Sequence, residues 1–468
     1  MAHRAGIVLG GSVLLLVLGA AAATCGEEEQ VFPLQELSLL REGDVSAELA
    51  SRLPQGQRVK LSGERNPQVK AYPNLRSERP LFGIALLNAD PDVPGSGVAF
   101  HLAVDASGGP KGRYDRLYVD LDRDLDLSND APIGPTSWEP SWAPTRPIDE
   151  KIVYFEPLGV PLDVGPPLGV QRLRLLPVLD ARDESYAGLT LTATEFRKGE
   201  VRIGGRRCDA YLAQGRALAG RFDKPFTGLL LTAPGTPTEG VLGRPADELR
   251  AMARVDGMLY RFSASPSGDR LAAGPYRGEL GVFHLGAGGR DLKTLRMRGR
   301  LVSKTAIVQF GDDAAEAQGS DRASIPVGDY LPQWLDVELG RLRLFVSQTR
   351  HSEGRLFDRQ GRPAVYGIQI RKDKPFVLDF SGEPEVVFVA PARDARVKRD
   401  EQIAVRTMIT DPRLDTMIGY LRDASAGGPE KFRYPDGRED ARRRRFDPLV
   451  TLTNSAGQIV ASSVGGFG

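Results

Sequence analysis

Short apolar segments that alternate with a period of two, separated by glycine and proline, most constrain the fold of this chain. Segments 98–104, 188–197 and 258–263 have the length and pattern of strands, and no long stretch carries the 3.6-residue period of a helix. The 53 glycines and 34 prolines suit many turns between short strands. The sequence therefore predicts an all-β protein with a multi-domain β-sandwich architecture, mostly antiparallel and with little helix.

Helix is expected in two short pieces only. Residues 37–53 have helical spacing in part, although Gly43 interrupts the pattern, and residues 245–254 lie in a proline- and glycine-rich candidate linker, 234–256. Residues 200–208 predict a hairpin around a two-residue turn, Gly204-Gly205. The proline-rich stretch 132–167 predicts a long ordered loop or lid, because proline removes backbone donors and blocks helix.

The length of 468 residues is enough for several domains with their own cores. The predicted division comprises a signal segment 1–25, an N-terminal polar region 26–80, a β domain 81–240, a second β domain 256–383 and an immunoglobulin-like C-terminal β domain 384–468. The net charge of +1 provides no global field for nucleic acid, so no nucleic-acid partner is expected.

The densest chemistry lies in the aspartate-rich loop, residues 119–130. Oxygen-bearing side chains occupy every second position of this loop, and they are Asp120, Asp122, Asp124, Asp126, Ser128 and Asp130. In calcium loops the first, third and fifth positions supply side-chain oxygens and the seventh a backbone carbonyl. The pattern predicts a Ca²⁺ site in which Asp126 contributes its carbonyl and Ser128 binds directly or through water.

This loop departs from a calcium loop at two positions. Leu125 stands where the sharp turn needs glycine, and a left-handed conformation costs a non-glycine residue about 1–2 kcal/mol. Asp130 closes the loop one residue early, so weak binding is expected. Leu127 is expected to anchor the loop in the core. The alternative is a half-buried strand or turn with a solvated acidic face.

The loop and its lead-in, Tyr114-Asp115-Arg116-Leu117-Tyr118-Val119-Asp120, resemble secreted bacterial β-proteins with a Tyr-Asp-x-Leu-Tyr-Val-Asp lead-in and an EF-hand-like loop, Asp-x-Asn-x-Asp-Gly-Asp-Leu-x-x-Asp. Shorter similarities lie at 195–200, 220–223 and 411–418. In such proteins the Gly-Arg-Phe-Asp segment often closes a second acidic loop. In this chain the residues before that segment, 217–219, are Ala-Leu-Ala, so no second acidic loop is expected. The resemblance implies a secreted β-protein and carries no activity to this chain.

A second resemblance concerns the C-terminal half. Ile325-Pro326-Val327-Gly328-Asp329-Tyr330 resembles the Pro-x-Gly-x-Tyr turn of transthyretin-like sandwiches. Two further charged segments predict solvated surface loops. They are the acidic group Asp312, Asp313, Glu316 and Asp321, and the basic run Arg442-Arg443-Arg444-Arg445.

The N-terminus has the features of a targeting segment. Arg4 precedes an apolar run, 7–23, and small residues suited to cleavage follow. Cys25 lies where a lipoprotein is cleaved, so lipidation of Cys25 is predicted, with membrane contact only through this lipid or the segment itself. The alternatives are a disulfide with Cys208, or a cleaved or retained segment with neither. The protein is expected outside the cytoplasm, in the periplasm, on the outer membrane or secreted.

No residue set indicates a known catalytic class. The four histidines are not paired at zinc spacing, and no serine-elbow or nucleotide motif has its structural context. The favoured function is a non-enzymatic cell-envelope protein, a structural or binding β scaffold with one weak calcium loop, whose partner is an envelope protein or a polysaccharide. The alternative is a secreted polysaccharide-directed hydrolase that uses carboxylates, with Trp138 and Trp142 over its cleft.

Overall fold

The computed structural model describes residues 28–41, 43, 46–53, 56–90, 93, 96–109, 112–136, 151–182, 187–240, 247–286, 294–311, 321–348, 367–379, 385–390, 406–411, 416–423, 430–433, 439–442, 449–453 and 456–464. Within these residues the chain is nearly all β, in several mostly antiparallel sheets, and the only helix is α1 (Ala47–Arg52). This confirms the predicted all-β, multi-domain sandwich architecture. No helix in the described part is long and apolar enough to span a membrane.

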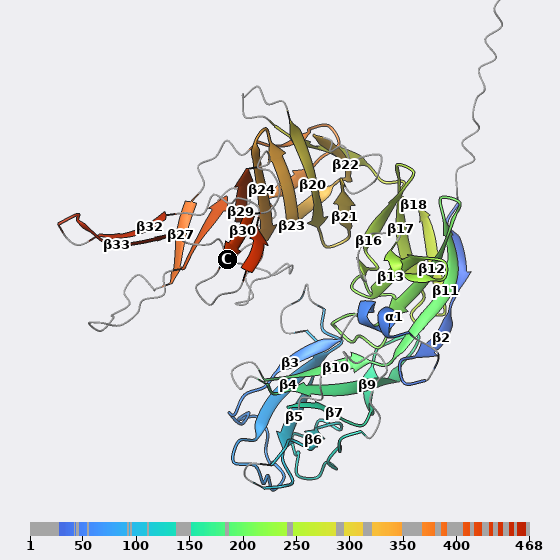
Figure 1. Cartoon of the computed structure of the whole chain (residues 1–468). Coiled ribbons are helices and arrows are strands. Elements are labelled where there is room, and N and C mark those ends of the chain that lie inside the picture. Colours follow the sequence, from blue (N-terminus) through green and yellow to red (C-terminus); the bar gives the residue numbers. More distant parts are fainter. Residues whose placement is uncertain are drawn as a thin grey trace, which may run out of the picture.

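The first sandwich carries the aspartate-rich loop and lies at the bottom of Figure 1. One sheet is antiparallel and consists of β4 (Leu81–Leu87), β5 (Val98–Asp105) and β6 (Arg116–Val119). The facing sheet consists of β3 (Gln57–Lys60), β10 (Gly188–Ala193), β9 (Val170–Asp180), β7 (Ile152–Tyr154) and β8 (Leu158–Asp163). Alternate apolar residues of both sheets, such as Phe100, Leu117 and Leu175, form one buried core.

A second sandwich packs a six-stranded sheet against part of a twelve-stranded sheet. The six strands are β2 (Gln35–Ser38), β11 (Glu195–Ile203), β12 (Arg206–Ala213), β13 (Gly228–Ala233), β14 (Thr236–Gly240) and β15 (Asp247–Glu248). The predicted hairpin is confirmed, because Ile203 pairs with Arg206 and both Gly204 (φ 56°) and Gly205 (φ 75°) are left-handed.

The twelve-stranded sheet continues to the upper left of Figure 1. Its strands in spatial order are β1 (Gln30–Pro33), β18 (Arg270–Pro275), β17 (Met258–Ala264), β16 (Ala251–Val255), β21 (Ile307–Phe310), β20 (Leu295–Val302), β23 (Gly328–Leu339), β24 (Leu342–Gln348), β29 (Thr416–Asp423), β28 (Arg406–Asp411) and β27 (Glu385–Ala390), and β25 (Ile368–Ile370) also pairs with β23. Its second half packs on a sheet of β22 (Arg322–Pro326), β19 (Leu280–Leu285) and β26 (Phe376–Leu378). Two separate hairpins are β30 (Glu430–Arg433) with β31 (Glu439–Arg442), and β32 (Leu449–Thr453) with β33 (Ile459–Val464).

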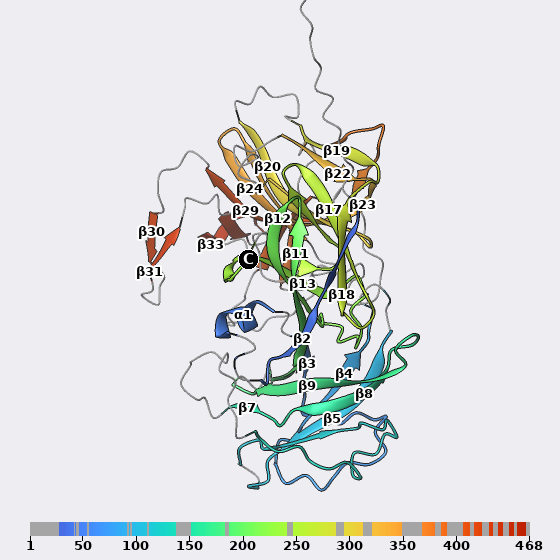
Figure 2. The ribbon, with the colours of Figure 1, turned by 90° about the vertical axis from the view of Figure 1, so that its right-hand side faces the viewer.

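The N-terminal segment ties the two sheets of the second sandwich together. Strand β1 pairs with β18 and β2 pairs with β11, so this blue run in Figure 2 contributes to both sheets of the second sandwich. Ser46 caps the N-terminus of the helix α1, because its hydroxyl oxygen accepts a 3.2 Å hydrogen bond from the amide of Leu49. Leu49 and Leu53 are buried against Phe196, which holds the helix beside β11.

Several sequence predictions are wrong in detail. The described part of the helix expected at 245–254, residues 247–254, forms β15 and most of β16, and the described residues of the candidate linker 234–256 include β14, β15 and β16. The helix expected at 37–53 is limited to α1. The described residues 151–167 include β7 and β8, so this part of the proline-rich stretch is not a loop. Pro161 lies on β8, which pairs only with β9 among the described strands, so its missing N–H breaks no ladder there.

The domain division stays a prediction, although one pairing bears on its last boundary. Strand β24 pairs with β29 from Leu342 to Gln348, so the twelve-stranded sheet runs across the boundary expected near residue 384. The Pro-x-Gly-x-Tyr segment forms the turn between β22 and β23, where the buried Tyr330 hydroxyl donates a 2.9 Å hydrogen bond to the Pro326 carbonyl. This bond gives the motif a structural role.

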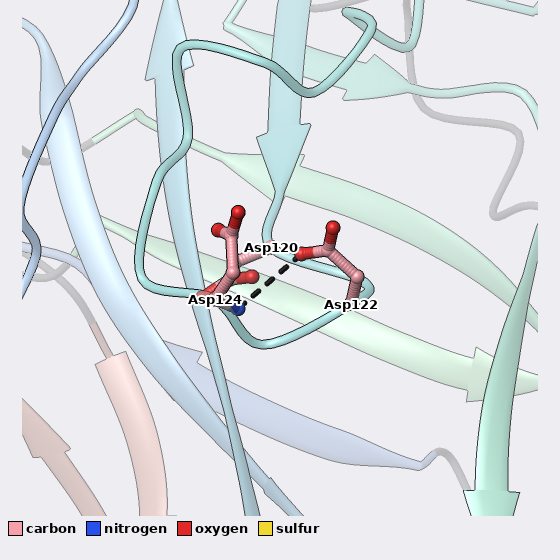
Figure 3. A group of neighbouring side chains, drawn as sticks. All are labelled: Asp120, Asp122 and Asp124. Atoms are coloured by element: carbon pink, nitrogen blue, oxygen red, sulfur yellow. Dashed lines mark hydrogen bonds between the residues drawn. The ribbon is translucent and has the colours of Figure 1, made fainter.

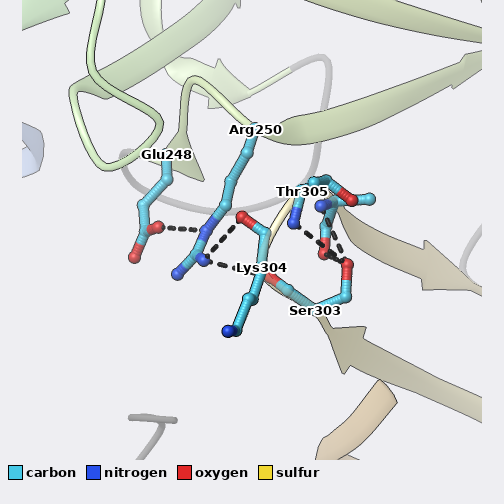
Figure 4. A network of polar contacts seen from close by, with 6 residues as sticks. Glu248, Arg250, Ser303, Lys304 and Thr305 are labelled. Atoms are coloured by element: carbon cyan, nitrogen blue, oxygen red, sulfur yellow. Dashed lines mark hydrogen bonds and ion pairs between the residues drawn. The ribbon is translucent and has the colours of Figure 1, made fainter. Parts of the chain in front are cut away.

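Arg250 joins the second sandwich to the rest of the twelve-stranded sheet (Figure 4). Its Nε donates to Glu248 Oε2 at 2.7 Å, and its Nη1 donates to the carbonyls of Ser303 at 3.0 Å and Lys304 at 3.3 Å. The Arg250 carbonyl accepts a 3.0 Å bond from the amide of Ile307, where β16 and β21 begin their parallel pairing. With only 7% of its side chain exposed, Arg250 is a buried tie between β15 and the β20–β21 turn.

Candidate metal centre

The lead-in to the aspartate-rich loop positions β6. The Tyr114 hydroxyl donates a 2.7 Å hydrogen bond to the Arg79 carbonyl, and Asp115 Oδ1 accepts a 2.6 Å bond from the amide of Ser107. Leu117 and Tyr118 are buried on opposite faces of the β4–β5–β6 sheet. The lead-in motif therefore acts structurally and delivers Asp120 to the end of β6.

Asp120 extends the sheet by one residue and is fully buried. Its amide donates a 3.0 Å bond to the carbonyl of His101 on β5. Its Oδ2 accepts a 3.1 Å bond from the amide of Leu125, while its Oδ1 is buried without a hydrogen-bond partner in the described part of the chain. Burial raises the pKa of this carboxyl, because the charged form loses its water.

Asp122 and Asp124 lie beside Asp120 on the exposed side of the loop (Figure 3). One carboxylate oxygen from each of these three residues lies within 4.8 Å of the others. Asp122 Oδ1 accepts a 3.3 Å bond from the amide of Asp124, and Asp124 Oδ1 accepts a 2.7 Å bond from the amide of Asp126. These hydrogen bonds form successive turns that bend the aspartate-rich loop away from an extended strand. The bend brings the negatively charged carboxylates close together.

Asp130 carries a further carboxylate near this three-residue cluster, whose charges act on it. Its side chain is partly buried, and its Oδ2 has no hydrogen-bond partner among the described residues. Burial raises the pKa of Asp130 to about 6, and the charges of Asp120, Asp122 and Asp124 act in the same direction. Two buried, unsatisfied carboxylate oxygens in one acidic cluster are costly without a cation or a proton.

Asp126 and Ser128 are placed differently. Asp126 Oδ1 accepts bonds from the Ser128 hydroxyl at 2.5 Å and from the Ser128 amide at 2.9 Å. These bonds lower the pKa of Asp126. The Ser128 hydroxyl is therefore engaged by Asp126, and the predicted parts of Asp126 and Ser128 in ion binding stay predictions.

The backbone of the loop is left-handed at two positions. Arg123 (φ 62°) and Leu125 (φ 67°) are both left-handed, although neither is glycine. Leu127 is fully buried against Phe82 and Tyr118, as expected for the anchor.

A contact far away in sequence holds the loop in place. The amide of Lys70 donates to the Leu125 carbonyl at 2.8 Å, and the amide of Leu127 donates to the Ala71 carbonyl at 3.0 Å. Lys70 Nζ also donates to the Asp124 carbonyl at 2.8 Å. The sequence provided no signal for Lys70 or Ala71, because their pairing with the loop is long-range and parallel. It also provided none for His101, which contacts Asp120 through the antiparallel pairing of β5 with β6.

The Gly-Arg-Phe-Asp segment at 220–223 is a structural tie. Arg221 and Asp223 form a two-bond ion pair at 2.6 and 2.5 Å, and Arg221 Nη1 donates to the Val164 carbonyl at 2.8 Å. Phe222 is buried in the second sandwich under the guanidinium of Arg197. Asp223 is therefore engaged by a neighbouring cation.

Comparison of the chain with protein-family models, curated proteins and solved structures gave no match. Asp120, Asp122 and Asp124 form a cluster that can hold a metal ion.

Other predicted features lie partly or wholly outside the described residues. Those outside are Cys25, Trp138, Trp142, Asp312, Asp313, Glu316 and Arg443-Arg444-Arg445. Cys208 is a buried free thiol whose pKa is raised by burial. Asp321 Oδ2 lies 3.1 Å from His284 Nε2, and Arg442 ends β31.

Proposed function

We propose that this chain is an extracytoplasmic cell-envelope protein, a structural or binding β scaffold whose aspartate-rich loop binds Ca²⁺. The observation that carries the metal site is the pair of buried carboxylate oxygens, Asp120 Oδ1 and Asp130 Oδ2, that have no partner within the described structure. A cation between them, Asp122 and Asp124 would satisfy both atoms and neutralise the mutual repulsion.

Calcium fits this ligand set better than the other common cations. The carboxylates of Asp120, Asp122, Asp124 and Asp130 offer oxygen ligands, which hard cations prefer and which are poor ligands for soft metals. Calcium ligands lie about 2.3–2.6 Å from the ion, so oxygens within 4.8 Å of one another can share it. The Asp126 carbonyl and the Ser128 hydroxyl, or waters, would complete the coordination, whereas Mg²⁺ demands a stricter octahedron.

The proposed role of the ion is to brace the loop against the 69–72 segment. Lys70 and Ala71 pair with the backbone on either side of Asp126, so an ion that orders the loop also supports this contact. The resemblance of the loop and its lead-in to secreted bacterial β-proteins supports a location outside the cytoplasm, as does the targeting segment.

Calorimetric titration with calcium tests the site. We expect a Kd of about 10⁻⁴–10⁻³ M and a stabilisation of at most about 1–2 kcal/mol in millimolar calcium. Asp122→Ala should abolish binding, and it should fold because Asp122 is exposed. Asp373→Ala removes the same charge from an exposed position outside the loop and is the control. A metal site would be excluded if calcium left the melting temperature of the wild type unchanged and if Asp122→Ala had the same melting temperature as the wild type in calcium.

Mass spectrometry of the mature N-terminus tests the proposed membrane attachment independently. A diacylglyceryl-modified Cys25 at the first position is the expected product. A mature chain that starts at Thr24, or a peptide that links Cys25 to Cys208, would contradict it.

A further inference from the structure

Lys70 brings a positive charge to the aspartate-rich loop from a distant part of the chain. Its Nζ donates a 2.8 Å hydrogen bond to the Asp124 carbonyl, and its backbone amide donates a 2.8 Å bond to the Leu125 carbonyl. The loop sequence itself, residues 119–130, holds five aspartates and one cation, Arg123. Lys70 therefore offsets part of a strong local excess of negative charge.

The Lys70 ammonium and the buried carboxylate of Asp120 lie at opposite ends of one peptide group. In the trans peptide between Asp124 and Leu125 the carbonyl and the amide point in opposite directions. The carbonyl accepts the bond from Lys70 Nζ, and the amide donates a 3.1 Å bond to Asp120 Oδ2. A cation at the carbonyl end polarises the peptide and strengthens the bond at the amide end. Lys70 thus acts on Asp120 through this backbone link.

The charge of Lys70 also acts on Asp126. The hydrogen bonds from Ser128 are the main cause of the lowered pKa of Asp126, and the positive charge of Lys70 acts in the same direction. A cation that stabilises these carboxylates opposes a second cation beside them, because like charges repel. Binding of calcium at the aspartate cluster is therefore weakened by Lys70.

The segment that carries Lys70 is held in place by contacts that do not involve the ammonium. The amide of Asn66 donates a 2.9 Å hydrogen bond to the Tyr72 hydroxyl. Val69 is buried in the same small core as Leu127, the anchor of the loop. A substitution at Lys70 can therefore remove the charge and leave the segment in place.

We propose that Lys70 is the built-in counter-ion of the aspartate-rich loop and sets its calcium affinity. In the calcium-free protein the ammonium stabilises the crowded carboxylates, and bound calcium replaces it in this role. Lys70 then weakens calcium binding, and calcium weakens the stabilisation by Lys70 by the same factor. The inference rests on the proposed calcium site. It makes Lys70 a positioning residue and not a ligand, because an ammonium has no lone pair to offer a metal.

Lys70→Gln tests the inference, since glutamine keeps an N–H donor but carries no charge. Calorimetric titration should show calcium binding about threefold tighter than in wild type. Chemical denaturation in chelator should show a less stable protein, and this loss of stability should be smaller in saturating calcium. Lys70→Arg keeps the charge and should bind calcium as wild type does.

Lys60→Gln is the matched control, because it removes the same charge from an exposed lysine at the end of β3, on the facing sheet of the same sandwich. It should leave calcium affinity unchanged. The proposal would be overturned if Lys70→Gln bound calcium no more tightly than wild type. It would also be overturned if the loss of stability were the same in chelator and in calcium, which would mean an ordinary structural contact.

These two results leave the proposed function intact as long as wild type binds calcium. No calcium binding by wild type would refute the proposed calcium site and this inference together, so the two failures are distinguishable.

Discussion

The backbone amide of Leu125 donates a 3.1 Å hydrogen bond to Asp120 Oδ2, while Oδ1 of the same carboxylate has no partner among the described residues. The left-handed backbone of Leu125 directs its amide toward Asp120. The strained backbone at Leu125 therefore provides a hydrogen bond to one carboxylate oxygen of the buried Asp120. The other oxygen of Asp120 is left for a ligand.

Replacing Leu125 by glycine should relieve this strain. Leu125 has a φ of 67°, which costs a residue with a Cβ about 1–2 kcal/mol. We expect Leu125→Gly to be about 1 kcal/mol more stable than Leu125→Ala in chelator, because both lack the leucine side chain but only alanine keeps the Cβ. Chemical denaturation measures the difference. A glycine variant no more stable than the alanine variant would show that the turn is unstrained.

The calcium-free protein should lose stability as the pH rises through the titration of the loop. In the folded protein the pKa of Asp130 is about 6, above its ordinary value of 3.8, and the pKa of Asp120 is also raised. Burial is the largest cause of the raised pKa of both carboxyls. A raised folded pKa means that the folded state holds the proton more tightly, so stability falls between about pH 4 and pH 6. Melting temperatures in chelator measure this fall.

Asp130→Asn is the matched variant for this pH dependence, because it keeps the shape of the side chain and removes the titrating charge. The fall in melting temperature between about pH 4 and pH 6 should be smaller in this variant. An identical pH profile would assign the effect to other groups.

A buried carboxylate on the twelve-stranded sheet should be important for stability. Asp336 is 6% exposed and accepts hydrogen bonds from Arg298 Nη2 at 2.8 Å and Arg343 Nε at 2.7 Å. Burial acts to raise the pKa of Asp336, but the two arginines outweigh it and hold the pKa below its ordinary value. The stabilisation is therefore present above about pH 4 and is lost as the pH falls through the lowered pKa.

Asp336→Asn should lower the free energy of unfolding by about 2–3 kcal/mol at neutral pH, because it removes the buried charge that pairs with both arginines. Asp329→Asn is the control, since Asp329 and Arg371 form an exposed pair and such pairs contribute less than about 1 kcal/mol. Denaturant melts compare the two variants. Equal effects would mean that burial of Asp336 adds nothing to its ion pairs.

The Arg250 tie should hold β15 and β16 to the β20–β21 turn. Arg250→Ala leaves Glu248 and two backbone carbonyls without this donor, so we expect a loss of about 2–3 kcal/mol. Arg250→Lys should recover part of the loss, because lysine keeps the charge without the planar fork. Hydrogen exchange should accelerate at residues 247–255 and 303–307. Protection equal to wild type at these residues would argue against a tie.

Features that depend on a local pattern could be predicted from the order of the amino acids. Short apolar segments of strand length placed β5 and β17, and β5 is a continuous apolar run because both of its faces are buried. The Gly204-Gly205 turn was predictable since both residues need a left-handed backbone. The grouping of Asp120, Asp122 and Asp124 followed from their spacing in one loop.

Which segments pair with one another depended on long-range packing. Residues 247–255 contain good helix formers, yet Leu249, Ala251, Ala253 and Val255 are all buried, and their period of two suits strands between β13, β17 and β21. Burial against distant strands outweighed the local helix propensity, which amounts to a few tenths of a kcal/mol per residue.

The environment of the loop was likewise decided at long range. Spacing alone could not show that Lys70 and Ala71 pair with the loop, that His101 accepts the amide of Asp120, or that Asp130 buries an oxygen. The bond from Lys70 Nζ to the Asp124 carbonyl, for example, joins positions 54 residues apart in the sequence. A local pattern specifies which groups a loop offers, and only folding determines which of them lose water and need a partner.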